Sequence, residues 1–271
     1  MSHTNSERFR SFLFVPGNKP ERFAKALASG ADAVIIDLED SVASDQKNAA
    51  RSAIVAWANP SQRVYVRVNG RGTPSFEQDA LLCRLPGVRG VVLPKAETPA
   101  DVTDLVALAR TRTAVFPLIE SAKGLWNALD IAKAPCVQQL MFGTLDFMVD
   151  MKLDLTNGDL NVFRAELAKV SRIAQIAAPI DGVTTEIDDA GRLSHETLNG
   201  KRWGFVGKLC IHPRQVATVN RCYAPSDSEL EWARRVLDAA RAAGGAAVSI
   251  DGQMVDRPVV VRAQQILKLM P

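Results

Sequence analysis

Eight short apolar segments recur along the chain, and six of them run into a polar or charged residue. They cover residues 11–16, 33–38, 64–69, 90–95, 115–120, 140–146, 181–183 and 207–213. Their starts are roughly 22 to 30 residues apart, with one longer gap after the sixth, and this spacing suits a strand followed by a crossover helix. Eight consecutive strand–helix units predict an α/β fold, a (β/α)₈ barrel.

An open, doubly wound sheet is the alternative for such units. Nucleotide-binding sheets of that kind carry a glycine-rich fingerprint, but no G-x-G-x-x-G follows the first segment and no G-x-x-x-x-G-K-[ST] occurs. The barrel is favoured by the polar residues that follow the apolar runs, because the carboxyl-terminal rim of this fold carries the chemistry. These residues are Glu39, Arg67, Lys95, Glu120, Asp146 and His212.

Helical segments connect and follow the strands. Thr98 and Pro99 supply a cap residue and a first-turn proline, and apolar residues keep a 3.6-residue period over residues 160–178. After the eighth strand, a capping-box pattern at Ser226 begins one helix, and Pro258 begins a last helix to about residue 269. We therefore predict a single domain over residues 1–271, with residues 225–271 as a C-terminal helical extension.

Composition limits the class of protein. The formal net charge of +3 and the lack of a Lys/Arg run argue against a nucleic-acid partner. The polar start of the chain lacks the apolar region of a signal peptide, and no run reaches the roughly 18 apolar residues of a membrane span. The four cysteines lack CxxC spacing and are typical of reduced core residues. We expect a cytoplasmic protein without a membrane partner.

Two of the strand-end acids, Glu120 and Asp146, follow neighbouring strands of the predicted barrel. Carboxylates that share one rim suit Mg²⁺, which prefers one or two of them and leaves positions open for water and substrate. The alternative is that each acid caps the next helix, since acids favour helix N-termini. These two residues by themselves leave both interpretations open.

Six motifs occur in order along the chain. They are RSFLFVPG (10–17), DLEDSV (37–42), RVN (67–69), LPK (93–95), GFVGKLCIHPRQ (204–215) and DGQMVDRP (251–258). Together they closely resemble the citrate lyase β-subunit-like (CitE-like) group of the HpcH/HpaI aldolase superfamily, over about residues 10–267. Each motif is weak by itself, but six in order at matching intervals make a strong resemblance.

The resemblance implies a TIM barrel that assembles as homotrimers or hexamers and uses Mg²⁺ to cleave or form C–C bonds in hydroxyacyl thioesters. By position, it implies that Glu120 and Asp146 are the Mg²⁺ ligands and that Arg67 is catalytic. Asp256 matches a catalytic acid/base that the extension contributes to a neighbouring subunit's site. The implied substrate-binding positions are Phe14, Lys25, Arg67, Glu120, Ile211 and His212, with Lys25 near the CoA moiety.

The chain departs from the family pattern at Leu145, where an acid is usual beside the metal ligand, and again over residues 150–153. Because Asp146 is present, these departures concern the substrate range more than the metal. Arg67 has a structural alternative as the ion-pair partner of Glu39 or Glu120. Asp256 has one as the cap of the helix that begins at Pro258.

The implied activity is that of a Mg²⁺-dependent CoA-ester lyase. Deprotonation of a β-hydroxyacyl-CoA, such as malyl-CoA or citramalyl-CoA, triggers retro-Claisen cleavage to a 2-oxo acid and an acyl-CoA. One alternative is the citryl-ACP lyase β subunit of a citrate lyase complex, and another is a non-catalytic homologue that binds CoA esters. A free 2-oxo-acid aldolase is less compatible with the C-terminal motif.

Overall fold

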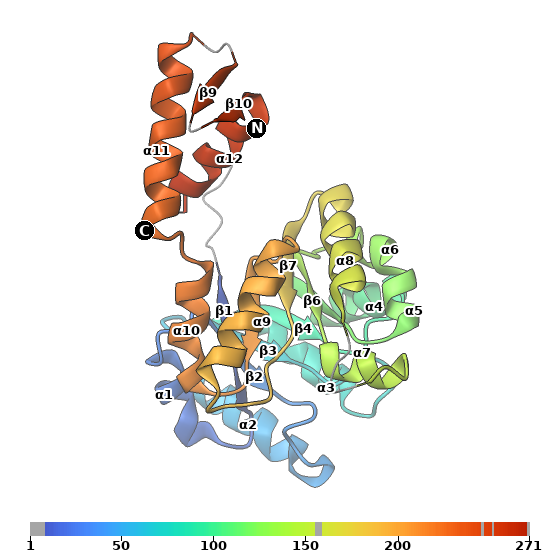
Figure 1. Cartoon of the computed structure of the whole chain (residues 1–271). Helices are drawn as coiled ribbons and strands as arrows, with labels where there is room; N and C mark the ends of the chain where they lie inside the picture. The colour runs from blue at the N-terminus through green and yellow to red at the C-terminus, as the bar shows by residue number, and fades with distance from the viewer. Residues whose placement is uncertain (1–8, 155–158, 245–246, 251, 270–271) are drawn as a thin grey trace. The chain divides into compact units, whose positions relative to one another are not determined.

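The computed structural model describes residues 9–154, 159–244, 247–250 and 252–269 (Figure 1). The chain forms two compact units, Met1–Asn220 and Arg221–Pro271. Asp251, the first residue of the last motif, lies outside the described residues. Within the described ranges, no helix combines the length and the apolar character that a membrane crossing requires.

The first unit is a closed barrel whose neighbouring strands are all parallel, with β8 pairing back onto β1 (Figure 1). Its strands are β1 (Ser11–Pro16), β2 (Ala33–Asp37), β3 (Val64–Arg67), β4 (Val88–Leu93), β5 (Ala114–Ile119), β6 (Gln139–Phe142), β7 (Ala177–Asp181) and β8 (Gly207–Cys210). The predicted (β/α)₈ barrel is confirmed.

Helices follow the strands and surround the barrel in Figure 1. The α-helices are α1 (Phe23–Leu27), α2 (Lys47–Trp57), α3 (Phe76–Ala80), α4 (Pro99–Ala109), α5 (Ala122–Trp126), α6 (Ala128–Ala132), α7 (Thr144–Asp150), α8 (Asn161–Ala174), α9 (Ala190–Arg202) and α10 (Pro213–Tyr223). Short 3₁₀ turns are η1 (Pro20–Arg22), η2 (Ser44–Gln46) and η3 (Leu81–Arg84). Thr98 and Pro99 begin α4 as predicted, and the Asp101 carboxylate accepts the Thr98 N–H at 2.8 Å.

Apolar side chains fill the barrel interior. The rings of Phe12, Tyr65 and Phe116 meet edge to face, with centroids 5.9 Å apart for Phe12 and Tyr65 and 5.2 Å apart for Tyr65 and Phe116. Ile35, Val92, Leu118, Met141, Ile180 and Leu209 belong to the same buried cluster. This packed interior is the rigid base on which the rim residues stand.

The seventh strand differs from the prediction. It spans Ala177–Asp181 and not residues 181–183, and α8 ends at Ala174 instead of continuing to about residue 178. The alanines that follow the helix keep its apolar period, so periodicity does not reveal where the helix ends. Gln175 ends it by adopting a left-handed conformation, with φ of 59°.

The second unit packs two helices against a short antiparallel hairpin. Its elements are α11 (Asp227–Ala242), β9 (Val248–Ile250), β10 (Gln253–Val255) and α12 (Arg257–Leu267). The capping box that begins α11 at Ser226 is confirmed, whereas the hairpin was not predicted. Ala233, Val236, Val255, Ala263 and Ile266 form its buried core.

Candidate active site

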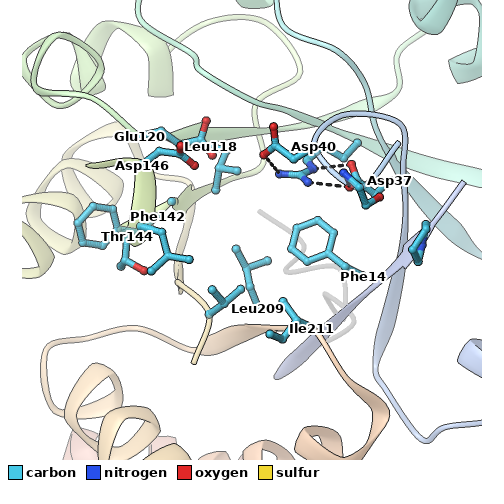
Figure 2. Close-up of a pocket in the computed structure, with 16 residues that line it drawn as sticks. Phe14, Asp37, Asp40, Leu118, Glu120, Phe142, Thr144, Asp146, Leu209 and Ile211 are labelled. Atoms are coloured by element: carbon cyan, nitrogen blue, oxygen red, sulfur yellow. Dashed lines mark hydrogen bonds and ion pairs between the residues drawn. The ribbon is translucent and has the colours of Figure 1, made fainter. Parts of the chain in front are cut away.

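Side chains along a barrel strand alternate in direction, so a residue two positions after an inward-facing core residue also points inward, at the rim. Phe12, Ile35 and Tyr65 point into the core, and the residues two positions further on, Phe14, Asp37 and Arg67, line a cavity of about 390 Å³. The remaining lining residues are Pro16, Asp40, Ser41, Leu118, Glu120, Phe142, Gly143, Thr144, Leu145, Asp146, Val183, Leu209 and Ile211. The cavity therefore lies at the carboxyl ends of the strands (Figure 2).

Arg67 is the last residue of β3, and its guanidinium is held from several directions. It pairs in register with Asp37 of β2, whose carboxylate accepts from Nε at 2.6 Å and from Nη2 at 2.7 Å. Nη1 lies 3.0 Å from Glu39 and 3.5 Å from Asp40, and the guanidinium stacks over the Phe14 ring at 4.8 Å. Burial alone would raise the pKa of Asp37, but the hydrogen bonds and charge of Arg67 outweigh it and lower that pKa.

Glu120 follows β5 directly and is only 5% exposed. Its carboxylate accepts a hydrogen bond from the Lys95 N–H at 2.8 Å. Burial, followed by the negative charges of Glu39 and Asp146, raises the pKa of Glu120 to about 8. A Cβ on Gly143 would overlap the Glu120 side chain, so glycine is required there for the carboxylate to reach the cavity.

The helix-capping alternative fails for Glu120, because Ser121 caps α5 by accepting from the Gly124 N–H. Asp146 lies in the first turn of α7, not at the end of β6, and the N-cap residue of that helix is Gly143. Figure 2 shows the two carboxylates together on one side of the cavity, with Asp37 and Asp40 across from them.

The donor set fits a magnesium ion. The charge of Asp146 adds to the cost of ionising the buried Glu120 carboxylate, and a cation between the two carboxylates would offset that cost. Among the described residues, no group of three or more His, Cys, Asp or Glu side chains is placed to hold a metal. A two-carboxylate site leaves positions for water and substrate oxygens, as Mg²⁺ prefers.

The wall facing these acids is apolar. Phe14, Leu209 and Ile211 lie opposite the carboxylates in Figure 2, and Leu145 and Val183 also line the cavity. Leu145 is 40% exposed and stands at the position where the resemblance led us to expect an acid. The cavity thus has one charged half and one apolar half.

The other predicted site residues lie elsewhere. Lys25 is exposed on α1 and His212 precedes α10, and neither lines the cavity. The N–H groups of Ile211 and His212 both donate to the Gln215 side chain, at 2.9 and 3.3 Å. Asp256 belongs to the second unit, where its carboxylate caps α12 by accepting from the Val259 N–H at 3.4 Å.

Comparison with known proteins decides the family. The model of the HpcH/HpaI aldolase/citrate lyase family matches residues 10–213, and that of the C–C bond lyases of the TIM-barrel fold matches residues 159–269. The chain belongs to the HpcH/HpaI aldolase/citrate lyase family. It is an enzyme of the carbon–carbon lyase class.

Relatives of this family member match it over nearly its whole length. A citrate lyase subunit beta-like protein of Deinococcus radiodurans is 38% identical, over 95% of this chain and 96% of the relative. The citrate lyase subunit beta of Leuconostoc mesenteroides is 36% identical over 98% and 94%, and a (3S)-malyl-CoA thioesterase of Cereibacter sphaeroides is 32% identical over 98% and 96%.

A solved structure from the same family has the same fold. It is the CitE protein of Mycobacterium tuberculosis in complex with magnesium, acetoacetate and coenzyme A. The two chains are 35% identical, with a TM-score of 0.86 over 97% of this chain and 98% of the other. The resemblance drawn from the six motifs is thereby confirmed, and magnesium is present in homologous structures.

From the sequence, Asp37, Glu39 and Asp40 are expected to order the rim around the site without binding the metal, and Lys95 is either a structural ion-pair partner or a substrate ligand. In this family member Asp37 and Asp40 line the cavity, and Lys95 contacts two of the rim carboxylates. The signal for Asp37 was available, because it stands two positions after the inward-facing Ile35. No sequence signal showed the backbone contact of Lys95.

Magnesium binding by this family member should depend steeply on pH. Because the pKa of Glu120 is raised to about 8, the ion must displace a proton below that pH. We expect the affinity to fall about tenfold for each pH unit below about 8, with release of about one proton per ion at pH 6. Calorimetry in buffers of different ionisation enthalpy measures both quantities.

The same group affects stability without metal. A pKa raised from 4.5 to about 8 adds stability below the lower value, and that stability is lost as the pH rises through the higher one. The thermal midpoint without Mg²⁺ should therefore fall over this pH range, with Glu39, whose pKa burial also raises, acting in the same direction. An affinity independent of pH and a flat stability profile would contradict the assignment.

Proposed function

We propose that this chain is a Mg²⁺-dependent CoA-ester lyase that cleaves a β-hydroxyacyl-CoA of the malyl or citramalyl type to a 2-oxo acid and an acyl-CoA. The observation that carries the proposal is the placement of Glu120 and Asp146 in one cavity with the fixed guanidinium of Arg67. Support also comes from the relative named for malyl-CoA and the neighbour bound to magnesium and coenzyme A.

Glu120 and Asp146 would hold the ion. When bound, Mg²⁺ supplies Lewis-acid polarisation of the substrate hydroxyl and of the carbonyl that forms from it. Gly143 leaves the room that the Glu120 side chain occupies, and the hydrogen bond from the Lys95 N–H helps to hold that buried carboxylate in place.

Arg67 would bind the negative charge of the 2-oxo acid half. The Arg67 guanidinium is always protonated and is held by two hydrogen bonds to Asp37. It therefore needs little rearrangement to bind a substrate oxygen. Asp40 is its weakest partner, at 3.5 Å with a side chain that is 56% exposed. A substrate carboxylate would displace Asp40 from Nη1 most easily.

Asp256 would act as the acid/base. Cleavage removes the proton from the substrate hydroxyl, whose oxygen becomes the carbonyl of the 2-oxo acid, and sends the electrons of the C–C bond to the carbon beside the thioester. That carbon must then receive a proton, so the reaction neither gains nor loses a proton overall. We propose that Asp256 of another copy delivers it, which makes the working form a homo-oligomer, a trimer or hexamer, in the cytoplasm. Phe14 and Ile211 would contact the acyl group, and His212, which follows Ile211, would support that side of the cavity. Lys25 would bind the CoA moiety.

The citryl-ACP lyase β subunit is the second candidate, favoured by the Leuconostoc relative. The cavity argues against it. A citryl group carries one carboxylate more than a malyl group, yet Arg67 is the one basic side chain among the described residues that line the cavity, and it already faces three acids. An additional carboxylate would meet the apolar half and remain unpaired.

A panel of thioesters tests the proposal. We expect Mg²⁺-dependent release of a 2-oxo acid from malyl-CoA or citramalyl-CoA, with chelation abolishing it and citryl-ACP reacting at least tenfold more slowly. Faster release from citryl-ACP would favour the second candidate. Release of free CoA thiol without a 2-oxo acid would indicate thioester hydrolysis instead. The absence of any turnover would favour a non-catalytic homologue that binds CoA esters.

A further inference from the structure

Two cations stand between acidic residues along one side of the barrel rim. Asp37 ends β2 and Glu39 follows it, Arg67 ends β3, Lys95 follows β4 and Glu120 follows β5. Because β2, β3, β4 and β5 are consecutive neighbours, the two cations stand between the acid group after β2 and Glu120. Lys95 is the cation nearer to Glu120 in this order.

Lys95 contacts an acid on each side of it. Its backbone N–H donates to Glu120 Oε2 at 2.8 Å, and its ammonium donates to Glu39 Oε1 at 2.6 Å and lies 3.7 Å from Asp40. Glu39 is buried, and its second oxygen, Oε2, faces Arg67 at 3.0 Å. Glu39 is thus shared between the two cations, one to each oxygen.

The backbone of Lys95 is in an unusual conformation. Its φ is 51°, in the left-handed region where a side chain is rarely found, and it directly follows Pro94 in a turn after β4. Glycine would adopt this conformation without strain. Residues held in such regions cluster at functional sites, where the surrounding structure fixes a side chain in a required place.

We propose that Lys95 is a positioning residue for the lyase reaction, with its ammonium holding Glu39 away from the metal position and from the substrate side of Arg67. Without the ammonium, the Glu39 carboxylate can turn fully onto Arg67 and compete with the substrate carboxylate. The Glu39 carboxylate can also turn toward Glu120, where a bound Mg²⁺ would attract it. The proposal rests on the proposed function, because it assigns Arg67 to the substrate and Glu120 to the ion.

Lys95→Met tests this, because it keeps the backbone N–H that contacts Glu120 and removes only the charge. We expect the KM for the thioester, and the Kd for pyruvate in the presence of Mg²⁺, to rise about tenfold. The Kd for Mg²⁺ alone, measured by calorimetry, should stay unchanged or tighten, because a positive charge beside the site has been removed. Structural damage would instead weaken Mg²⁺ binding. Lys95→Arg should restore part of the pyruvate affinity.

Lys152 provides a matched control. It is a lysine with nearly the same backbone conformation, φ of 54°, and it does not line the cavity. Lys152→Met should leave the Kd for Mg²⁺ and the Kd for pyruvate at wild-type values. Wild-type pyruvate binding by Lys95→Met, or weaker Mg²⁺ binding, would overturn the proposal. Because both ligands can be titrated without turnover, a wild-type enzyme that cleaves no thioester would refute the proposed function and still leave Lys95 tested.

Discussion

Glu120→Gln is expected to reduce thioester cleavage about a thousandfold and to abolish measurable Mg²⁺ binding. The amide has the shape of the carboxylate but no charge, so the ion would lose one of its two anionic ligands in a buried pocket. The thermal stability of the metal-free protein should not fall with the activity. Because burial raises the pKa of Glu120, a neutral side chain should leave the thermal midpoint without Mg²⁺ equal to or above that of the wild type at pH 8 and above.

Asp150→Asn is the matched control for this variant. Asp150 lies one turn after Asp146 on α7, and its carboxylate accepts the Ala122 N–H at 2.7 Å without lining the cavity. An asparagine oxygen can accept the same bond, so turnover and Mg²⁺ affinity should stay close to wild type. Glu120→Gln protein that kept wild-type turnover would remove Glu120 from the metal site.

Asp256→Asn is expected to lower kcat by about 10²–10⁴-fold while leaving the affinity for the thioester close to wild type. Asparagine caps a helix about as well as aspartate, so the contact with the Val259 N–H and the thermal midpoint should be retained. Asp256→Ala should lose the activity and also about 1 kcal/mol of stability. The comparison of the two variants separates catalysis from capping.

Asp227→Asn serves as the control in the second unit, since Asp227 is an acid in the first turn of α11. Its kcat should be unchanged. An Asp256→Asn enzyme with wild-type kcat, next to an Asp256→Ala enzyme that is only less stable, would return Asp256 to a purely structural role as a helix cap.

Mixed oligomers test whether Asp256 acts from another copy. Glu120→Gln and Asp256→Asn proteins are each expected to be inactive. In co-expressed oligomers, an intact Glu120 from one chain can meet an intact Asp256 from another, and random assembly would restore about a quarter of the sites. Activity that remained at the level of the single variants would show that both residues must come from the same chain.

Much of this site follows from local sequence. The alternation of inward-facing residues connects Phe12 to Phe14 and Tyr65 to Arg67, and an apolar run that ends in an acid identifies Glu120. These features depend on side-chain periodicity within single strands, which is a local property. The end of α8 could not be located in the same way, because the alanines after it fit a helix and a strand equally well and the left-handed Gln175 carries no mark in the sequence.

By itself, then, the sequence determined the barrel, the metal-binding acids that we propose and the family. The spacing of the strands and the order of the motifs can both be seen in the linear sequence. Only the tertiary structure decided which charges meet. The sharing of Glu39 between Arg67 and Lys95, the hydrogen bond that Glu120 accepts from Lys95 and the need for glycine at residue 143 all depend on neighbours from other strands. Electrostatic contacts depend on distances in space, and the closure of the barrel sets those distances.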